Sequence, residues 1–284
     1  MGNMKKALVV CGPTASGKSE LSDTLAEEMT QAHGGYVPTL VVDSMQVYRE
    51  IPTITNQARE RPAELVGIVS VAEEWTVARH RERAEEIIEG IDTPFVLDSG
   101  TGMYLNAIIL DVPLAPKVAE QTRHVAQNIA AGAPNPRRAS RAKELELAGD
   151  AQRGSIWDGD LRYDTTILYL RPKRAELDAA IAKRSEIIVR DGLEEAARLR
   201  EITGTNSSVM DSIGVRELVI HLDGEITIEQ ARDQISTRTR RLARRQIRWF
   251  DKLSRTLKDR VEISVGESPA DLDFTNCMHD RIRA

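Results

Sequence analysis

The chain of 284 residues has little of what builds several common classes of protein. Its two cysteines, Cys11 and Cys277, are too few for a disulfide framework or a four-cysteine metal site. No apolar run approaches the roughly 20 residues of a membrane-spanning helix, and no internal repeat or low-complexity segment is present. These absences exclude disulfide-rich secreted domains, membrane-spanning proteins and solenoids. We expect a cytoplasmic protein that has no membrane partner.

Aromatic residues make up only 4% of the chain, so aliphatic side chains must form most of the core. The formal net charge of −5 argues against a protein that binds nucleic acid over its whole surface. Residues 234–260 are different, because they hold ten Lys or Arg residues against two Asp residues, a local net charge of +8. A solvated basic face is the ordinary interpretation of such a run. Cations this poorly compensated repel one another, and we therefore predict a polyanionic partner.

Short apolar stretches alternate with longer amphipathic ones along most of the chain. The predicted strands are residues 7–11, 39–42, 95–97, 165–170 and 261–265. The predicted helices between them are residues 18–31, 76–90, 174–202 and 227–257. This order is typical of an α/β protein whose parallel sheet is covered by helices on both faces. Ligands of such proteins bind at the carboxyl ends of the strands.

The alternation is interrupted between the third and fourth predicted strands. Two helical stretches, 118–131 and 138–147, flank the sequence Pro134-Asn135-Pro136, and neither is followed by a strand of its own. We therefore predict a catalytic core of residues 1–114 and 165–284 and a small helical insertion of residues 115–164. Basic residues of the insertion gather at Arg137, Arg138, Arg141 and Lys143.

A glycine-rich turn follows the first predicted strand and precedes a helix. The turn and the start of the helix comprise Gly12, Pro13, Thr14, Ala15, Ser16, Gly17, Lys18 and Ser19. The spacing is that of a phosphate-binding P-loop, in which peptide N–H groups and the helix amino terminus attract anionic oxygens. A lysine at position 18 supplies a cation, and a serine hydroxyl at position 19 suits a Mg²⁺ ion that bridges phosphates. The sequence therefore predicts binding of a di- or triphosphate with Mg²⁺ in a P-loop NTPase-like fold.

Polar residues follow two other predicted strands. Asp43 comes directly after residues 39–42, and Thr101 lies in the glycine-rich segment after residues 95–97. We expect both to lie beside the phosphate loop. Asp43 is a candidate general base; as alternatives it would be a helix cap or a magnesium ligand. Thr101 is a candidate hydrogen-bond donor near the reacting centre, with an ordinary turn residue as the alternative.

Five segments resemble the signatures of tRNA dimethylallyltransferases. They are the phosphate loop at 12–19, Asp-Ser-Met-Gln-Val-Tyr-Arg at 43–49, Gly-Thr-Gly-Met-Tyr-Leu at 100–105, Ile-Gly-Val-Arg-Glu-Leu at 213–218 and the arginine-rich block ending in Gln-Ile-Arg-Trp-Phe at 239–250. The resemblance covers the chain from residue 8 to about residue 253. The phosphate loop is shared with many kinases, whereas the second and fifth segments are far more particular to this family.

The resemblance implies transfer of a dimethylallyl group from dimethylallyl diphosphate to N6 of the adenosine 3′ of the anticodon in tRNA. The loop would then hold the diphosphate leaving group, with Lys18, Arg216 and a Mg²⁺ ion on Ser19 stabilising its charge. Asp43 would accept the proton of the amine, and Thr101 would lie at the reacting centre. Residues expected to contact the tRNA anticodon stem-loop are Asp43, Ser44, Met45, Gln46, Arg238, Arg240, Arg241, Arg244, Arg245 and Arg248, with the basic cluster of the insertion beside them.

Some segments depart from the family pattern. Ser99 replaces the first glycine of Gly-Gly-Thr, and residues 53–57 read Thr-Ile-Thr-Asn-Gln in place of a Gly-Thr-Ala-Lys segment. Three alternatives therefore stay open: a prenyltransferase acting on free AMP, a nucleotide or metabolite kinase that turns over ATP, and a non-catalytic RNA-binding protein. We expect a monomer, because no apolar stripe is left without a place in the core.

Overall fold

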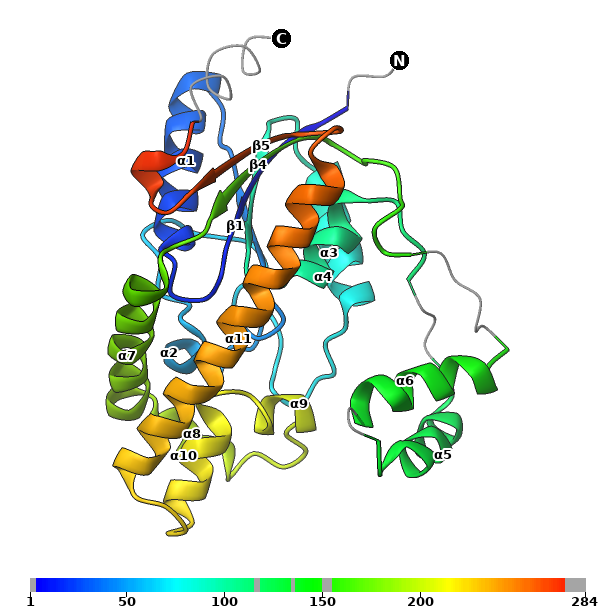
Figure 1. Ribbon diagram of the computed structural model, residues 1–284, viewed down its shortest axis with the longest axis vertical. Helices are drawn as coiled ribbons and strands as arrows, with labels where there is room; N and C mark the ends of the chain where they lie inside the picture. The colour runs from blue at the N-terminus through cyan, green and yellow to red at the C-terminus, as the bar shows by residue number, and fades with distance from the viewer. Residues whose placement is uncertain (1–3, 115–117, 134–135, 150–154, 274–284) are drawn as a thin grey trace.

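The computed structural model describes residues 4–114, 118–133, 136–149 and 155–273 (Figure 1). Cys277 lies outside this part of the chain, and the side chains of Arg137 and Arg138 are not described. The sheet has five parallel strands in the order β2-β3-β1-β4-β5. Its strands are β1 (Lys6–Cys11), β2 (Thr39–Val42), β3 (Phe95–Ser99), β4 (Asp164–Leu170) and β5 (Glu262–Gly266).

Eleven α-helices are present in the described residues. The helices before the fourth strand are α1 (Lys18–His33), α2 (Pro52–Thr55), α3 (Val77–Glu89), α4 (Gly102–Ile109), α5 (Glu120–Ala130) and α6 (Pro136–Leu147). Those after it are α7 (Arg174–Asp191), α8 (Leu193–Leu199), α9 (Ser207–Met210), α10 (Val215–Leu222) and α11 (Ile228–Leu257), and a 3-10 turn, Pro269–Asp271, follows β5. The predicted parallel α/β architecture is confirmed.

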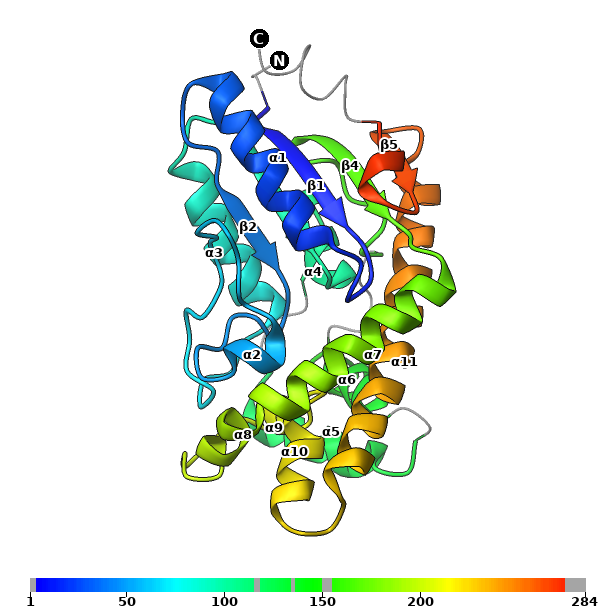
Figure 2. The same ribbon diagram turned by 90° about the vertical axis from the view of Figure 1, so that its left-hand side faces the viewer.

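Helices cover both faces of the sheet. On one face, Leu21 and Leu25 of α1 pack against Leu8, Val10 and Leu168 of the strands (Figure 2). On the other face, α3, α4 and the carboxyl-terminal half of α11 form the largest core cluster with the opposite side of the same strands. Alternate residues of β1, β2, β3 and β4 are therefore buried on opposite faces, which explains why these strands read as mostly apolar runs.

A second apolar cluster joins the segment after β2 to the helices of the carboxyl-terminal half. Tyr48, Ile51 and Ile54 pack against Ile188 of α7 and Leu218 of α10. The predicted single helix over residues 174–202 is wrong in one respect, because α7 ends at Asp191 and α8 begins at Leu193. Gly192 lies between them in contact with Ile54, and this packing, which no local pattern reveals, separates the two helices.

Four helices lie where the sequence pattern predicts no element: the four-residue helices α2 and α9, and the longer helices α4 and α10. Helices α4 and α10 each have eight residues, which is too short to show a clear amphipathic period. In addition, α4 is buried at almost every position. Strand β3 extends to Ser99, two residues beyond its predicted end, which places Asp98 inside the sheet. No helix in the described ranges is long and apolar enough to cross a membrane.

The insertion leaves and re-enters the core at one place. Leu110 and Leu161 form an isolated antiparallel bridge, and the N–H of Asp111 donates to the carbonyl of Asp160. Between these points, α5 and α6 pack against each other and lie to one side of the sheet (Figure 1). Both predicted helices are thus present, while the role of the insertion as a separate domain stays a prediction.

One buried histidine lies at the junction of the two apolar clusters. The Trp75 indole N–H donates to Nδ1 of His80 over 3.0 Å, and the ring centroids of His80 and Tyr104 are 5.0 Å apart. Burial lowers the pKa of His80 from 6.5 to about 4. The imidazole is therefore neutral in the folded protein at neutral pH.

This pKa predicts a pH dependence of stability. As pH falls through 6.5, the unfolded chain binds a proton at His80 before the folded chain does, so folding stability is fully present above this pH and is lost towards pH 4. We expect a loss of about 2 kcal/mol between pH 7 and pH 5 from this residue. Urea unfolding of the wild type and of His80→Gln at both pH values measures it. Equal pH dependence of the two proteins would contradict the prediction.

Candidate active site

The phosphate loop joins β1 to α1 at the carboxyl edge of the sheet. Ala15 and Gly17 adopt left-handed backbone angles, with φ of 64° and 83°. For alanine this conformation is strained, and such strain is common where backbone N–H groups are turned towards a ligand. The N–H groups of Gly17, Lys18 and Ser19 have no acceptor in the described part of the chain. The loop therefore presents unpaired N–H groups at the start of α1, and phosphate binding by it stays a prediction.

Lys18 is held inside the site with no acidic partner. The residue is 9% exposed, and no carboxylate forms an ion pair with its ammonium group among the described residues. Burial raises the pKa of the neighbouring Cys11 thiol, and the Lys18 charge only partly opposes this shift. Cys11 is thus a neutral core residue, as its position in β1 indicates. A buried and unpaired cation beside free N–H groups is suited to an anionic ligand.

Three side chains converge on the backbone of Gly100. A methyl group placed there would lie 3.2 Å from Oδ2 of Asp43, 3.3 Å from Cε of Lys18 and 3.5 Å from Nε2 of Gln246. Asp43 follows β2, Gly100 follows β3 and Lys18 follows β1, and these strands are neighbours in the sheet. The predicted approach of Asp43 to the phosphate loop is confirmed by this geometry.

The two oxygens of Asp43 have different environments. Oδ1 accepts hydrogen bonds from the N–H groups of Met45 at 2.8 Å and Gln46 at 3.2 Å. Oδ2 faces Gly100 and accepts no hydrogen bond in the described residues. One oxygen therefore caps the turn that follows β2, and the other is available in the site. The capping and general-base interpretations of Asp43 are compatible with one another.

Thr101 links the loops that follow β2 and β3. Its hydroxyl accepts a long hydrogen bond of 3.4 Å from the N–H of Ser44, and its own N–H donates to the carbonyl of Val42 over 3.1 Å. The residue is also the N-cap of α4, although its side chain makes no capping bond there. Thr101 thus lies beside Asp43, and its role towards a substrate stays a prediction.

The other predicted contacts differ in how far they are exposed. Ser44 and Met45 are half-buried, whereas Gln46 is 7% exposed and faces the interior. Arg216 on α10 has a side chain that is 56% exposed and lies 3.9 Å from Asp211. No described contact joins Arg216 to the phosphate loop. Its role as a phosphate ligand therefore stays a prediction.

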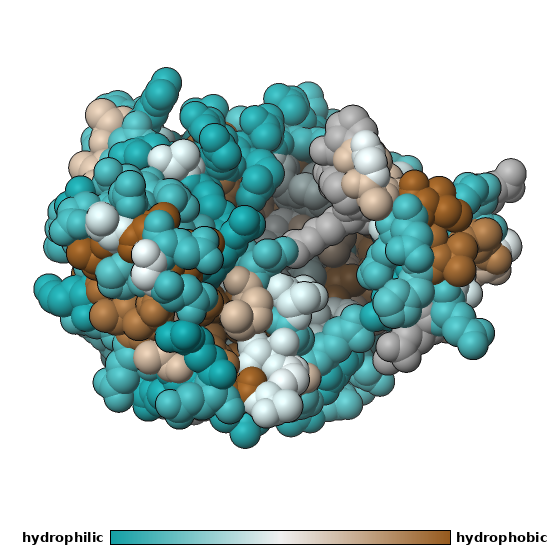
Figure 3. All heavy atoms as spheres, turned by 90° about the horizontal axis from the view of Figure 1, so that it is seen from below, coloured by the Kyte–Doolittle hydropathy of each residue, from teal (hydrophilic) through white to brown (hydrophobic). Residues whose placement is uncertain are grey.

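The arginines of α11 divide into two groups. Arg238 forms an ion pair with the buried Glu217, and Arg240 forms one with Asp178 over 3.2 Å. The exposed arginines, for which no ion pair is found in the described part of the chain, are Arg241, Arg244, Arg245 and Arg248. The molecule is hollowed between its main body and the α5–α6 pair, and hydrophilic side chains surround the hollow (Figure 3). RNA binding by all six arginines stays a prediction, and the exposed four are the better candidates.

Arg184 is a site residue that sequence reasoning missed. It donates to Oδ1 of Asn56 over 2.6 Å and to the carbonyls of Ile54 and Thr53 over 2.8 and 3.3 Å. Burial lowers its pKa to about 10, although the charge of Asp43 acts in the opposite direction. The guanidinium therefore lies close enough to Asp43 to interact with it. A single arginine within an amphipathic helix gives no signal of this role.

A buried cluster of charges supports the phosphate loop from the α1 side. The Arg59 guanidinium contacts Asp98 at 2.6 Å, Asp23 at 2.7 Å and the carbonyl of Ser19 at 3.3 Å. Burial alone would lower the pKa of Arg59, because it disfavours the charged guanidinium. The carboxylates of Asp98 and Asp23 outweigh the effect of burial, so the pKa of Arg59 is raised. The second carboxylate oxygen of Asp98, Oδ1, is buried and has no hydrogen-bond partner among the residues that the structure describes. This arrangement was not predicted, because Asp98 was placed in the turn after the predicted strand 95–97 and Arg59 lies in no predicted helix or strand.

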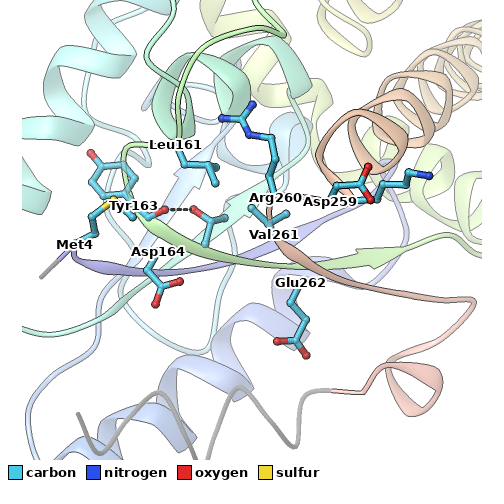
Figure 4. A pocket seen from close by; sticks show the side chains of 10 residues that line it. Met4, Leu161, Tyr163, Asp164, Asp259, Arg260, Val261 and Glu262 are labelled. Atoms are coloured by element: carbon cyan, nitrogen blue, oxygen red, sulfur yellow. Dashed lines mark hydrogen bonds between the residues drawn. The ribbon is translucent and has the colours of Figure 1, made fainter. Parts of the chain in front are cut away.

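A cavity of about 300 Å³ lies at the opposite edge of the sheet (Figure 4). Its lining includes Asp164 at the start of β4, Glu262 at the start of β5, and Lys258 and Arg260 after α11. Because all strands are parallel, this edge holds their amino ends. The cavity is therefore separate from the residues that converge on Gly100.

The parallel sheet and the glycine-rich loop between β1 and α1 define an α/β protein with a P-loop-like fold. A family model described as IPP transferase matches residues 46–253. The tRNA dimethylallyltransferase of Rubrobacter xylanophilus is 58% identical to this chain over 279 residues, and the match covers 96% of each. The chain therefore belongs to the IPP transferase family, and it is a transferase.

Solved structures agree with this assignment. The full-length tRNA isopentenylpyrophosphate transferase of Bacillus halodurans is 25% identical, with a TM-score of 0.69 over 99% of this chain and 95% of that chain. A eukaryotic dimethylallyltransferase acting on tRNA shares the fold, with a TM-score of 0.71 over 98% of this chain and 78% of that chain. The family membership favours prenyl transfer over the kinase and non-catalytic alternatives.

The Arg59 cluster predicts a large effect on stability. Arg59→Ala leaves Asp23 and Asp98 as buried carboxylates without their cation, which should lower the free energy of unfolding by about 3–5 kcal/mol. Urea denaturation measures this change. The control is Arg83→Ala, which removes an exposed ion pair with Glu86 and should leave stability close to that of the wild type. An Arg59→Ala protein as stable as the control would contradict the prediction.

Proposed function

We propose that the protein transfers a dimethylallyl group from dimethylallyl diphosphate to N6 of the adenosine 3′ of the anticodon in tRNA and releases diphosphate. The observation that carries the proposal is the convergence on Gly100 of Asp43 and of Lys18, which belongs to the phosphate loop. A nucleophile activated at Oδ2 of Asp43 is then next to a leaving group held by the loop. The names of the relatives support this choice of donor and acceptor.

The reaction exchanges one bond at the allylic carbon for another. The bond from this carbon to the ester oxygen of the diphosphate breaks, and its electron pair leaves with the diphosphate. A bond forms to the adenine N6, whose lone pair is weakly nucleophilic because it is delocalised into the ring. Asp43 takes the proton that N6 loses, through the oxygen that accepts no internal hydrogen bond.

Charge on the departing diphosphate is stabilised by groups already in place. The free N–H groups at the start of α1 and the unpaired Lys18 face the same site, and neither needs to reorganise as the bond breaks. Arg216 is proposed as an additional ligand of the diphosphate.

A Mg²⁺ ion fits the donor set on the α1 side of the loop. The Ser19 hydroxyl and the unpartnered, buried Oδ1 of Asp98 would hold it, because hard oxygen ligands are those that Mg²⁺ prefers. When bound, the ion would neutralise diphosphate charge. Asp98 and the carbonyl of Ser19 contact the same Arg59 guanidinium, so Asp98 and Ser19 lie close to one another.

The acceptor base must leave its stack to reach this site. Proteins that modify a base inside a loop extrude it, and they bind the flanking backbone through cations. Ser44, Met45 and Gln46 follow Asp43 and are proposed to contact the base. The RNA backbone phosphates on either side of it are proposed to bind the α11 arginines and the basic residues of the insertion. A monomeric state and a cytoplasmic location remain predictions.

Replacement of Asp43 tests the chemical role. Asp43→Asn keeps the oxygen that accepts from Met45 and Gln46 but removes the proton acceptor, so kcat should fall by about 10²–10⁴-fold while diphosphate affinity is retained. Prenyl incorporation is followed by mass with Mg²⁺, dimethylallyl diphosphate and either an anticodon stem-loop RNA, AMP or ATP. We expect product with the RNA alone. Full activity of the variant, or modification of AMP in preference to RNA, would refute the proposal.

Charge reversal on α11 tests the RNA surface. Arg241→Glu combined with Arg245→Glu should raise the KM for RNA and reduce the slope of log affinity against log salt by about one to two. The matched control reverses the charges of Arg255 and Lys258, which are exposed at the carboxyl end of α11. Filter binding at several salt concentrations measures the slopes. An unchanged slope in the Arg241/Arg245 variant, or an equal loss of RNA affinity in both variants, would contradict RNA binding by Arg241 and Arg245.

A further inference from the structure

We infer that Gln246 is a positioning residue that couples the RNA-binding face of α11 to the phosphate loop. The inference rests on the proposed function, because it assigns the exposed arginines to RNA and the loop to the diphosphate of the donor. It concerns a neutral side chain that lies among cations and that takes no part in the chemical step.

The carboxamide of Gln246 bridges two strand-end loops. Its Oε1 accepts a hydrogen bond from the N–H of Thr14 over 2.9 Å, and its Nε2 donates to the carbonyl of Gly100 over 2.8 Å. Thr14 belongs to the phosphate loop after β1, and Gly100 follows β3. One side chain from α11 therefore ties together the loop that holds phosphate and the loop on which Asp43 and Lys18 converge.

The carboxamide supplies both the acceptor and the donor that the two bonds need. A peptide N–H is a donor alone and a peptide carbonyl is an acceptor alone, so the two contacts also fix which end of the amide faces which loop. An ionised glutamate would keep the first bond and lose the second. A methionine would keep the approximate length of the side chain and lose both.

The same stretch of α11 is anchored one turn further on. The Trp249 indole N–H donates to Oδ1 of Asn106 over 3.3 Å, and a methyl group on Gly102 would lie only 2.1 Å from the Trp249 ring. Gln246 and Trp249 thus hold α11 against the start of α4 and the loop before it. Movement of the helix at this point would be transmitted to Gly100.

The opposite side of this stretch presents cations to solvent. Arg245 is the neighbour of Gln246 in the chain, Arg244 and Arg248 flank them, and all are exposed with no ion pair in the parts of the chain that are described. RNA phosphates bound there would order the turn of helix that carries Gln246. Binding of RNA and of diphosphate would then favour the same arrangement of the loops, and each would strengthen the other by the same factor.

The test measures this coupling without requiring turnover. Pyrophosphate with Mg²⁺ is titrated calorimetrically into the full-length protein, with and without a saturating anticodon stem-loop RNA. We expect the wild type to bind pyrophosphate more tightly when RNA is present. Gln246→Met should weaken pyrophosphate binding by about tenfold and abolish the effect of RNA, because both bonds are lost. Gln246→Glu should also lose the effect of RNA, because the bond to Gly100 is lost.

Two further measurements separate positioning from a general loss of structure. Gln234→Ala, an exposed glutamine on the same helix, should keep wild-type affinity and coupling. The salt dependence of RNA binding to the protein without pyrophosphate should be unchanged in Gln246→Met, because the arginines remain, while kcat falls and the gain in RNA affinity on addition of pyrophosphate is lost. Wild-type pyrophosphate affinity together with intact coupling in Gln246→Met would overturn the inference. Coupling without any prenyl transfer by the wild type would instead refute the proposed function.

Discussion

The close approach of three loops at Gly100 is the constraint on which the rest of the site depends. The β2-β3-β1 order brings the residues after these strands to one edge, and the absence of a side chain at Gly100 lets a carboxylate, an ammonium group and a carboxamide meet there. Asp43 and Lys18 both face Gly100, yet no ion pair joins them among the described residues. Asp43 instead uses one oxygen for its own turn, so the second oxygen and Lys18 are available to a ligand.

The short helix α2 shows how the segment that departs from the family pattern is held. Its first N–H groups, at Thr53 and Ile54, donate to the buried carboxylate of Glu195 over 2.7 and 3.0 Å. Its last carbonyls accept from Arg184. An anion at the amino end and a cation at the carboxyl end satisfy both sets of unpaired backbone groups. Side chains of α7 and α8 therefore fix the backbone beside Asp43, without a requirement for the usual residues of this segment.

The sequence allowed the sheet, most helices and the phosphate loop to be predicted, because each depends on local period and turn chemistry. It also placed Asp43 and Thr101 correctly, since parallel strands bring their carboxyl ends together. Arg59, Asp98, Arg184 and Gln246 could not be predicted in this way. Their partners are 36–232 residues away in the chain, and a lone charged or amide residue within a helix or strand shows no pattern that identifies its partner.

Helix α11 has one face in the core and an arginine-rich face in solvent. Ala243, Phe250 and Leu253 are buried, and Arg238 and Arg240 are neutralised by Glu217 and Asp178. The remaining arginines repel one another in the free protein, because they lie within about two turns of helix. Packing of the buried face tolerates this repulsion, since the apolar contacts extend along most of the 30-residue helix. A polyanion would relieve it, and for this reason the unpaired arginines favour an RNA ligand over a role in folding.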